Sequence, residues 1–394
     1  MAAFSFGFWR FATENENYIF PILFSLLGSY YFIKSYAQKK YDLKYILASG
    51  LFATIACLYH QIHIFWFIGL FFGWIWIDKT SGLKRGILFA GTFIIAPVIY
   101  FLVILFYLHQ NLSWFSVTRF VFHDYYIGAA GNTFGFNNVL LGAINFIRTF
   151  FQVHGQMLVM ISRHKIWLLP GVIAIGFMIR AIIDLTTFKK LSNLKGPKMN
   201  IIVKIHLLIL LLQLAFAVYN IGNAEFMIMI PALLAIILVG MKRIPMSSLA
   251  FIAVAMLIWN FTYGIYPNNS LHFNADAQVT AFVIEHPKDK FIASEPAIIL
   301  NQYYYQEGHW PENVWPGPDY YKLHGPVSEL KTKIDSALKS GGNIYTDCTG
   351  RPEVMSRGSM LFSSKDFFKP YNLKNTVATF ETDAGKHVIV KIYP

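Results

Sequence analysis

Lysine and arginine gather in every second gap between the apolar segments of this chain, and this alternation constrains the fold more than any other feature. The basic gaps contain Lys39, Lys40 and Lys44; Lys79, Lys84 and Arg85; Lys189, Lys190, Lys195 and Lys198; Lys242 and Arg243. The gaps between them carry His, Glu, Asn and Gln instead. Connections rich in Lys and Arg stay on the cytoplasmic side of a membrane because these side chains resist translocation. The alternation therefore predicts a polytopic membrane protein whose basic loops are cytoplasmic.

Eight apolar segments are candidates for membrane spans. A helix needs about 20 largely apolar residues to cross a hydrocarbon core of about 30 Å. The eight segments are Tyr18 to Ser35, Tyr45 to Tyr59, Ile64 to Ile77, Gly86 to Leu108, Ile166 to Ile183, Ile201 to Tyr219, Phe226 to Gly240 and Met246 to Ile265. The second, third and seventh are short. Together with the charge alternation, they place both termini outside the membrane, and we expect a bacterial inner-membrane protein.

The composition supports this class and excludes nucleic-acid binding as the reason for the basic charge. Hydrophobic residues make up 55% of the chain and charged residues only 14%, which is far from a soluble average. The excess of 33 Lys and Arg over 21 Asp and Glu lies largely in the four cytoplasmic gaps. We therefore expect membrane lipid, and no nucleic acid, as a partner.

The chain changes character at Pro267, where the apolar segments end and charge, Pro and Gly return to soluble levels. Two domains are expected: a membrane region over residues 1–266 and an extracytoplasmic domain over 267–394. The fold class is thus a polytopic α-helical membrane protein with about eight spans and a small C-terminal α/β domain.

The elements of the C-terminal domain follow from its alternating pattern. We expect helices over Ala275 to Glu285, Ala297 to Gln306 and Ser328 to Leu338, strands over Lys290 to Ser294 and Asn343 to Asp347, a loop over His309 to Pro318, and a hairpin of Val377 to Glu381 with His387 to Tyr393 that turns at Asp383 to Lys386. Asp347, Cys348 and Arg351 follow a strand, but polar strand ends are more often ordinary loop chemistry than a site.

The long outer segment, about residues 109–165, contains an expected amphipathic helix. Asn145, Arg148, Gln152 and Gln156 recur at spacings of three and four, with apolar residues opposite. Such a helix can lie in the membrane interface. The rival interpretation is a ninth span over Asn137 to Ile161, which would reverse the side of every later loop, so the charge alternation argues against it.

Polar side chains gather at the outer ends of the expected spans. They are Arg10, Glu14 and Glu16 before the first span, His60, Gln61 and His63 between the second and third, His123 and Asp124 in the long loop, and Asn220, Asn223 and Glu225 between the sixth and seventh. Helix capping and interfacial turns explain such residues one at a time. As a set they fit a site for a phosphate or a sugar, because Arg pairs with phosphate and a carboxylate binds a metal or acts as a base.

Two segments resemble a known family. The stretch FWRFATENENYIFPILFSLLGSYYF, which contains Glu14 and Glu16, resembles the acid and long helix that open a span in polyprenyl-phosphate-sugar-dependent glycosyltransferases of the GT-C superfold. The stretch GNAEFMIMIPALLAIILVG resembles a late span of the same enzymes, with Pro231 inside it. The relatives in question are the protein mannosyltransferases and the aminoarabinose transferases, several of which carry an outer domain after the last span.

The resemblance implies transfer of a sugar from a polyprenyl-phosphate carrier to a glycan, lipid or protein acceptor at the outer face. Glu14 or Glu16 stands in the place of the outer acid of these enzymes. Their catalytic Asp has no counterpart here, so Glu14, Glu16 and Asp124 are candidate catalytic acids in a secondary role only. The polar residues at the outer span ends supply the candidate substrate-binding residues, namely Arg10, His60, Gln61, His63, His123, Asn223 and Glu225. A divalent metal, Mg or Mn, is the expected cofactor if one acid serves as a ligand.

The chain also departs from that family. The enzymes begin inside and carry a catalytic Asp in their first large outer loop, whereas this chain reaches its first expected span within 20 residues. We therefore expect an incomplete N-terminus or a relative without catalysis. Two further classes remain open: a non-catalytic scaffold with an outer binding domain, and a transporter of lipid-linked sugars, although ionisable residues near the middle of the spans are few.

Overall fold

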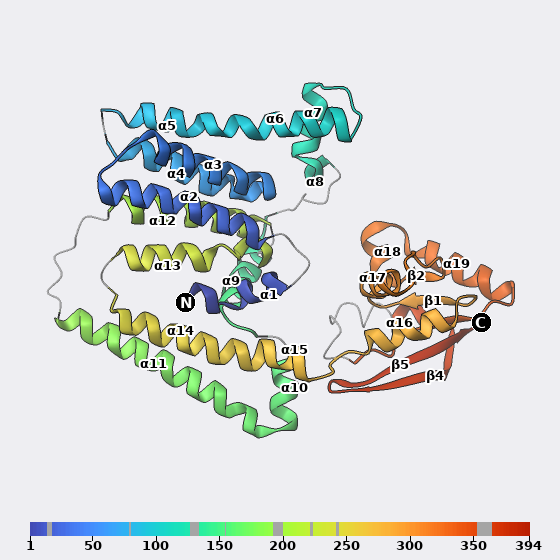
Figure 1. Cartoon of the computed structure of the whole chain (residues 1–394). Coiled ribbons are helices and arrows are strands. Elements are labelled where there is room, and N and C mark those ends of the chain that lie inside the picture. Colours follow the sequence, from blue (N-terminus) through green and yellow to red (C-terminus); the bar gives the residue numbers. More distant parts are fainter. Residues whose placement is uncertain are drawn as a thin grey trace. The chain divides into compact units, whose positions relative to one another are not determined.

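The computed structural model describes residues 1–13, 18–78, 80–126, 134–153, 155–191, 200–220, 224–241, 244–352 and 365–394. The chain divides into two compact units, one of residues 1–152 with 169–261 and the other of residues 153–168 with 262–394. The first unit is helical, and the second contains the sheet (Figure 1).

Helices of four to 24 residues make up the first unit, and most of the longer ones run side by side in Figure 1. They are α1 (Phe6–Thr13), α2 (Ile19–Gln38), α3 (Leu43–Tyr59), α4 (Ile64–Trp76), α5 (Gly82–Gly91), α6 (Ile95–Leu102), α7 (Trp114–Val121), α8 (His123–Tyr126), α9 (Phe136–Phe150), α11 (Leu168–Leu191), α12 (Ile201–Tyr219), α13 (Ile230–Gly240) and α14 (Met246–Asn260). Local signals set several ends: Asn200 Oδ1 accepts from the Val203 amide at 2.9 Å and so caps α12.

Four helices in the described part of the chain are long and apolar enough to cross a membrane, which indicates an integral membrane protein. They are Gly82–Tyr107, Lys165–Thr187, Ile201–Tyr219 and Met246–Ile265. They correspond to the fourth, fifth, sixth and eighth expected spans. The second, third and seventh coincide with shorter apolar helices, Leu43–Tyr59, Gln61–Trp76 and Ala224–Gly240, and the first corresponds to α2.

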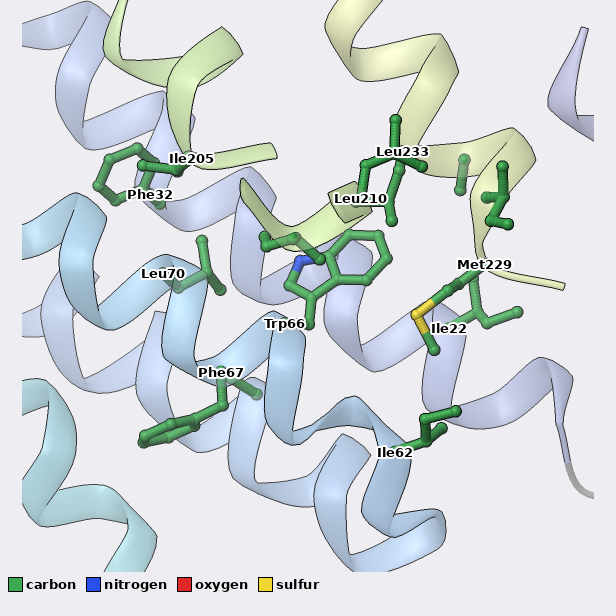
Figure 2. Packing of buried hydrophobic residues seen from close by; sticks show 14 of the residues in the cluster. Ile22, Phe32, Ile62, Trp66, Phe67, Leu70, Ile205, Leu210, Met229 and Leu233 are labelled. Atoms are coloured by element: carbon green, nitrogen blue, oxygen red, sulfur yellow. The ribbon is translucent and has the colours of Figure 1, made fainter. Parts of the chain in front are cut away.

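Trp66 lies at the centre of the helical core (Figure 2). Its ring is fully buried among Leu210, Leu233 and other apolar side chains. The indole Nε1 donates to Ser29 Oγ at 2.8 Å, and the same hydroxyl lies 2.9 Å from His206 Nε2. These bonds join α2, α4 and α12 through polar groups that the apolar surroundings would otherwise leave unsatisfied.

The second unit contains a sheet with strand order β2-β1-β3-β5-β4. Its elements are α10 (Gly155–Arg163), a π-helix (Phe261–Ile265), α15 (Tyr266–Ser270), α16 (Asp276–Glu285), β1 (Lys290–Ala293), α17 (Pro296–Glu307), β2 (Val314–Pro316), α18 (Pro318–His324), α19 (Val327–Lys339), β3 (Ile344–Thr346), β4 (Asn372–Thr382) and β5 (Gly385–Tyr393). Strand β1 pairs in parallel with β2 and β3, and β5 pairs antiparallel with β3 and β4.

Three expectations about local structure need correction. The expected loop of His309 to Pro318 contains β2, a three-residue edge strand that tolerates a proline because one side needs no ladder bonds. The hairpin begins at Asn372, earlier than the expected Val377. Its early start was not predicted because the first residues of β4 are mostly exposed and lack an apolar alternation. The amphipathic helix of the outer segment does not continue to Gln156, since α9 ends at Phe150 and α10 begins at Gly155.

The break between α9 and α10 also bears on the ninth span. A span over Asn137 to Ile161 would need one continuous helix. Instead Gln152 lies outside both helices, and its backbone amide donates to Asn260 Oδ1 at 2.9 Å. The described structure therefore gives the rival interpretation no continuous helix.

Candidate functional site

A pocket of about 530 Å³ lies in the first unit, at the end of α3 and the start of α4. Aromatic rings form much of its wall, namely Tyr59, Phe65, Tyr100, Phe120, Phe122, Phe216 and Phe226. Four polar side chains, those of His60, Gln61, His123 and Asn220, also line it. The size and the mixture of apolar wall with few polar groups are typical of small-molecule sites.

The turn between α3 and α4 positions two of these polar groups. Helix α3 ends at Tyr59, and His60 adopts an extended conformation with φ −153° and ψ 120°. Its Nδ1 accepts a hydrogen bond from the Ile62 amide at 3.3 Å, which caps the short 3-10 turn Gln61–His63. The capped turn places His60 and Gln61 along one edge of the pocket.

His63 belongs to the same turn but does not line the pocket. Its side chain is buried, and its Nδ1 lies 2.7 Å from Ser25 Oγ in α2. This contact ties the turn to the helix core. The structure thus separates the three neighbouring residues into two that face the pocket and one that faces the core.

Tyr18, which is not among the expected site residues, brings two of them together. Its hydroxyl donates to Glu225 Oε2 at 3.0 Å, and its ring centroid lies 4.9 Å from that of His60. The available signal was only its position, at the first residue of an expected span. Through Tyr18, the segment before α2 and the segment before α13 meet beside the pocket.

The remaining expected residues have different outcomes. Arg10 lines a separate, much smaller cavity together with Arg148 and Thr149. Glu14, Glu16 and Asn223 lie outside the described residues, and the side chain of Asp124, in α8, is likewise not described. In the described part of the chain, no three His, Cys, Asp or Glu side chains gather as metal ligands. The expected Mg or Mn site therefore has no ligand set among these residues.

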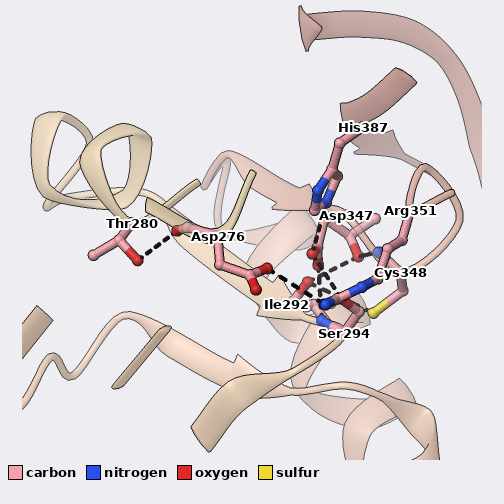
Figure 3. Close-up of polar contacts among 9 residues, drawn as sticks. Asp276, Thr280, Ile292, Ser294, Asp347, Cys348, Arg351 and His387 are labelled. Atoms are coloured by element: carbon pink, nitrogen blue, oxygen red, sulfur yellow. Dashed lines mark hydrogen bonds and ion pairs between the residues drawn. The ribbon is translucent and has the colours of Figure 1, made fainter. Parts of the chain in front are cut away.

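A buried polar cluster occupies the second unit, where β1 and β3 end (Figure 3). Asp347 follows β3 and accepts hydrogen bonds from the Ser294 amide and the Ser294 hydroxyl, both at 2.7 Å. His387 Nε2 of β5 lies 3.1 Å from Asp347 Oδ2. Arg351 Nη1 lies 3.4 Å from Asp276 Oδ1, so an ion pair joins the start of α16 to the segment after β3.

The geometry of this cluster differs from a nucleophilic triad. In a serine triad the histidine lies between the serine and the aspartate and accepts the hydroxyl proton. Here Asp347 lies between Ser294 and His387, and the Ser294 hydroxyl donates directly to the carboxylate. The Ser294 hydroxyl therefore does not contact a histidine base as it would in such a triad, and the described contacts join the ends of β1 and β3 to β5.

The pKa values of the two aspartates in the cluster are shifted in opposite directions. Burial raises the pKa of Asp347, but the hydrogen bond and charge of His387, together with the Ser294 bonds, outweigh it and lower the pKa overall. Burial raises the pKa of Asp276, and the nearby Arg351 only partly offsets that rise. The fully bonded carboxylate is thus the better stabilised anion.

Comparisons with protein families, with characterised proteins and with solved structures gave no match to this chain. The resemblance to the glycosyltransferases therefore rests on the two sequence segments alone. The pocket beside His60 carries the functional argument, because it is a concave site that combines polar groups from three of the expected outer segments.

Proposed function

We propose that this chain is a membrane protein of the lipid-linked sugar pathway, which binds a polyprenyl-phosphate sugar in the pocket beside His60 and transfers the sugar to an acceptor at the outer face. The carrying observation is the pocket itself, with an aromatic wall and the polar side chains of His60, Gln61, His123 and Asn220. An aromatic wall suits an isoprenoid chain and sugar faces. Imidazole and amide groups suit phosphate and hydroxyl oxygens.

The same proposal includes the finer topology. All eight apolar segments cross the inner membrane, and both termini lie outside. The three shorter apolar helices and α2 cross it as well, packed against their neighbours in the bundle. The charge alternation supports this arrangement, because each basic gap then faces the cytoplasm. The turn that carries His60 and Gln61 is consequently outside. The resemblance to the glycosyltransferases implies sugar transfer on the same side.

The roles of the residues follow from chemistry and position. His60 and Gln61 contact the phosphate or sugar, and Glu225 holds Tyr18 against His60 through the 3.0 Å hydrogen bond. Glu14, Glu16 and Asp124 remain the proposed acids, one of which serves as a base or binds a divalent metal. Arg10 is the proposed phosphate partner for a ligand that extends past the pocket.

One observation favours a second candidate function, in which the protein binds or moves a lipid-linked sugar without catalysis. Among the described residues that line the pocket there is no Asp or Glu. A sugar transferase needs a base for the acceptor hydroxyl, whereas a binding protein or transporter needs only the aromatic and polar contacts.

Binding and transfer are measured separately to test both candidates. The full chain in lipid nanodiscs is titrated with a radiolabelled undecaprenyl-phosphate sugar, and the double variant His60→Ala with Gln61→Ala is compared with His309→Ala, an exposed histidine of the second unit. We expect binding to fall at least tenfold only in the double variant. Unchanged binding in that variant rejects the pocket as the site, and binding without any transfer to acceptors selects the non-catalytic candidate.

A further inference from the structure

Helix α9 presents its apolar side outward, which is the reverse of a surface helix on a water-soluble protein. The exposed large apolar side chains are Phe136, Val139, Leu140, Leu141, Ile144 and Ile147, whose exposed fractions range from 38% to 78%, and Asn137 and Ala143 are exposed among them. Asn138 and Thr149 are each only 3% exposed. An exposed apolar face of this kind marks a contact with lipid or with another protein.

Polar contacts and close packing hold the other side of α9 against the unit. Asn138 Nδ2 donates to the Tyr219 carbonyl at 2.9 Å, and Asn138 Oδ1 accepts from the Gly135 amide at 3.0 Å. At Gly142 a Cβ atom would lie 2.9 Å from a methyl group of Val218, so the two helices approach closely there. These contacts, together with Phe146 and Phe150, which pack against the hydrophobic core, fix the orientation of α9 in the unit.

The contact with Tyr219 also sets the depth of α9 in a membrane. Tyr219 is the last residue of the candidate span Ile201–Tyr219, which has 19 residues. At a rise of about 1.5 Å per residue this helix is about 28 Å long, close to the thickness of the hydrocarbon core. Its last residue thus lies near the boundary between hydrocarbon and headgroups. In Figure 1, α9 runs across the direction of α12 and α13.

We infer that α9 is an in-plane membrane helix whose apolar face contacts bilayer lipid at the level of the headgroup boundary. The occupant is lipid because Asn138 bonds α9 to the last residue of a bilayer-length helix, and because the exposed face consists mostly of apolar side chains, with Asn137 as a polar member. Polar groups of a membrane protein turn toward the interior, and apolar groups turn toward the acyl chains. The inference concerns the resting protein and is independent of the proposed sugar transfer.

Site-specific labels on the full chain test this contact. Cysteine replaces Leu140, Ile144 or Ile147 in turn, and each variant carries an environment-sensitive fluorophore in lipid nanodiscs. The native Cys57 and Cys348 are both buried, and the unmutated chain serves as the labelling blank. Glu381→Cys, at an exposed acid of the second unit, is the control for a position in water.

The inference requires strong quenching of all three α9 labels by nitroxide-bearing lipids and weak quenching by aqueous iodide, with the reverse at position 381. Strong iodide quenching on α9 would overturn it and make the face an aqueous surface. Labels shielded from both quenchers would also overturn it, since the face would then be covered by protein. Cross-linking between Ile147→Cys chains would identify a second copy as that protein.

Discussion

The Tyr18 hydroxyl donates a 3.0 Å hydrogen bond to Glu225 Oε2, across 207 positions of the sequence. The bond joins the start of α2 to the 3-10 turn Ala224–Met227 before α13. Because the Tyr18 ring also lies against His60, one side chain links three segments that the sequence predicts to be outside. The edge of the pocket at His60 therefore depends on Tyr18, a residue with a positioning role.

Replacing Tyr18 by Phe tests this link. The substitution keeps the ring against His60 and removes only the hydroxyl, so we expect a loss of about 1 kcal/mol in unfolding free energy, since the carboxylate is partly solvated. If the proposed function is correct, affinity for the lipid-linked sugar also falls. Thermal unfolding and ligand titration in nanodiscs measure the two effects. Tyr305→Phe, at a tyrosine that is 91% exposed, should change neither.

Gly69 should tolerate no side chain. A Cβ atom at Gly69 of α4 would lie 2.2 Å from Ile209 Cγ1 of α12. Gly69→Ala should therefore lower the unfolding free energy by about 1 to 3 kcal/mol through overpacking. Gly176→Ala is the matched control, because nothing lies within 4 Å of its added methyl and alanine favours the helix. Equal melting temperatures for the two variants would contradict the close packing of α4 on α12.

Acid should weaken the second unit through Asp347. A carboxyl whose pKa is lowered in the folded state contributes stability above its unfolded pKa of about 3.9, and that contribution is lost as the pH falls through the folded pKa. Asp276, with a raised pKa, has the opposite sign and is a cost at neutral pH. Asp347→Asn should remove about 3 kcal/mol at neutral pH, because a buried partner is lost.

The measurement for Asp347 is thermal unfolding of the full chain between about pH 3 and pH 7, where carboxyl groups titrate. The acid-induced decrease in melting temperature should be smaller in Asp347→Asn than in the unmutated chain. Glu381→Gln, at an exposed acid, is the control and should keep the full decrease. A decrease of the same size in all three proteins would mean that other carboxyl groups cause it.

The proposed topology is tested with exposed positions. Cysteines that replace Lys40 and Lys84 should be protected from an impermeant thiol reagent in intact cells, whereas those that replace Gln110 and Lys331 should react. All four side chains are exposed, so their labelling reports the side of the membrane. Buried positions, such as Gly82 and Asn313, would report burial instead. Reaction of Lys84→Cys with the reagent in intact cells would contradict the proposed topology and indicate the opposite orientation.

Local and additive properties could be predicted from the sequence. Apolar length and loop charge predicted a membrane protein, because transfer free energies add residue by residue along a helix. The positions of α16, β1, α17, α19 and β3 followed from turn residues and periodicity. Where the pattern was weak, as in β2 and the start of β4, sheet pairing decided the structure, since ladder partners far along the chain stabilise residues with little local preference.

Contacts between distant residues were decided only by the tertiary structure. The sequence placed His60, Gln61 and His63 in one outer turn, but the packing of α2 against that turn directs His63 to Ser25 and leaves the other two at the pocket. Likewise the periodicity of α9 was visible, whereas the choice of which side faces outward came from Asn138 and Tyr219. Side-chain direction depends on neighbours from other helices, and a helical period does not contain that information.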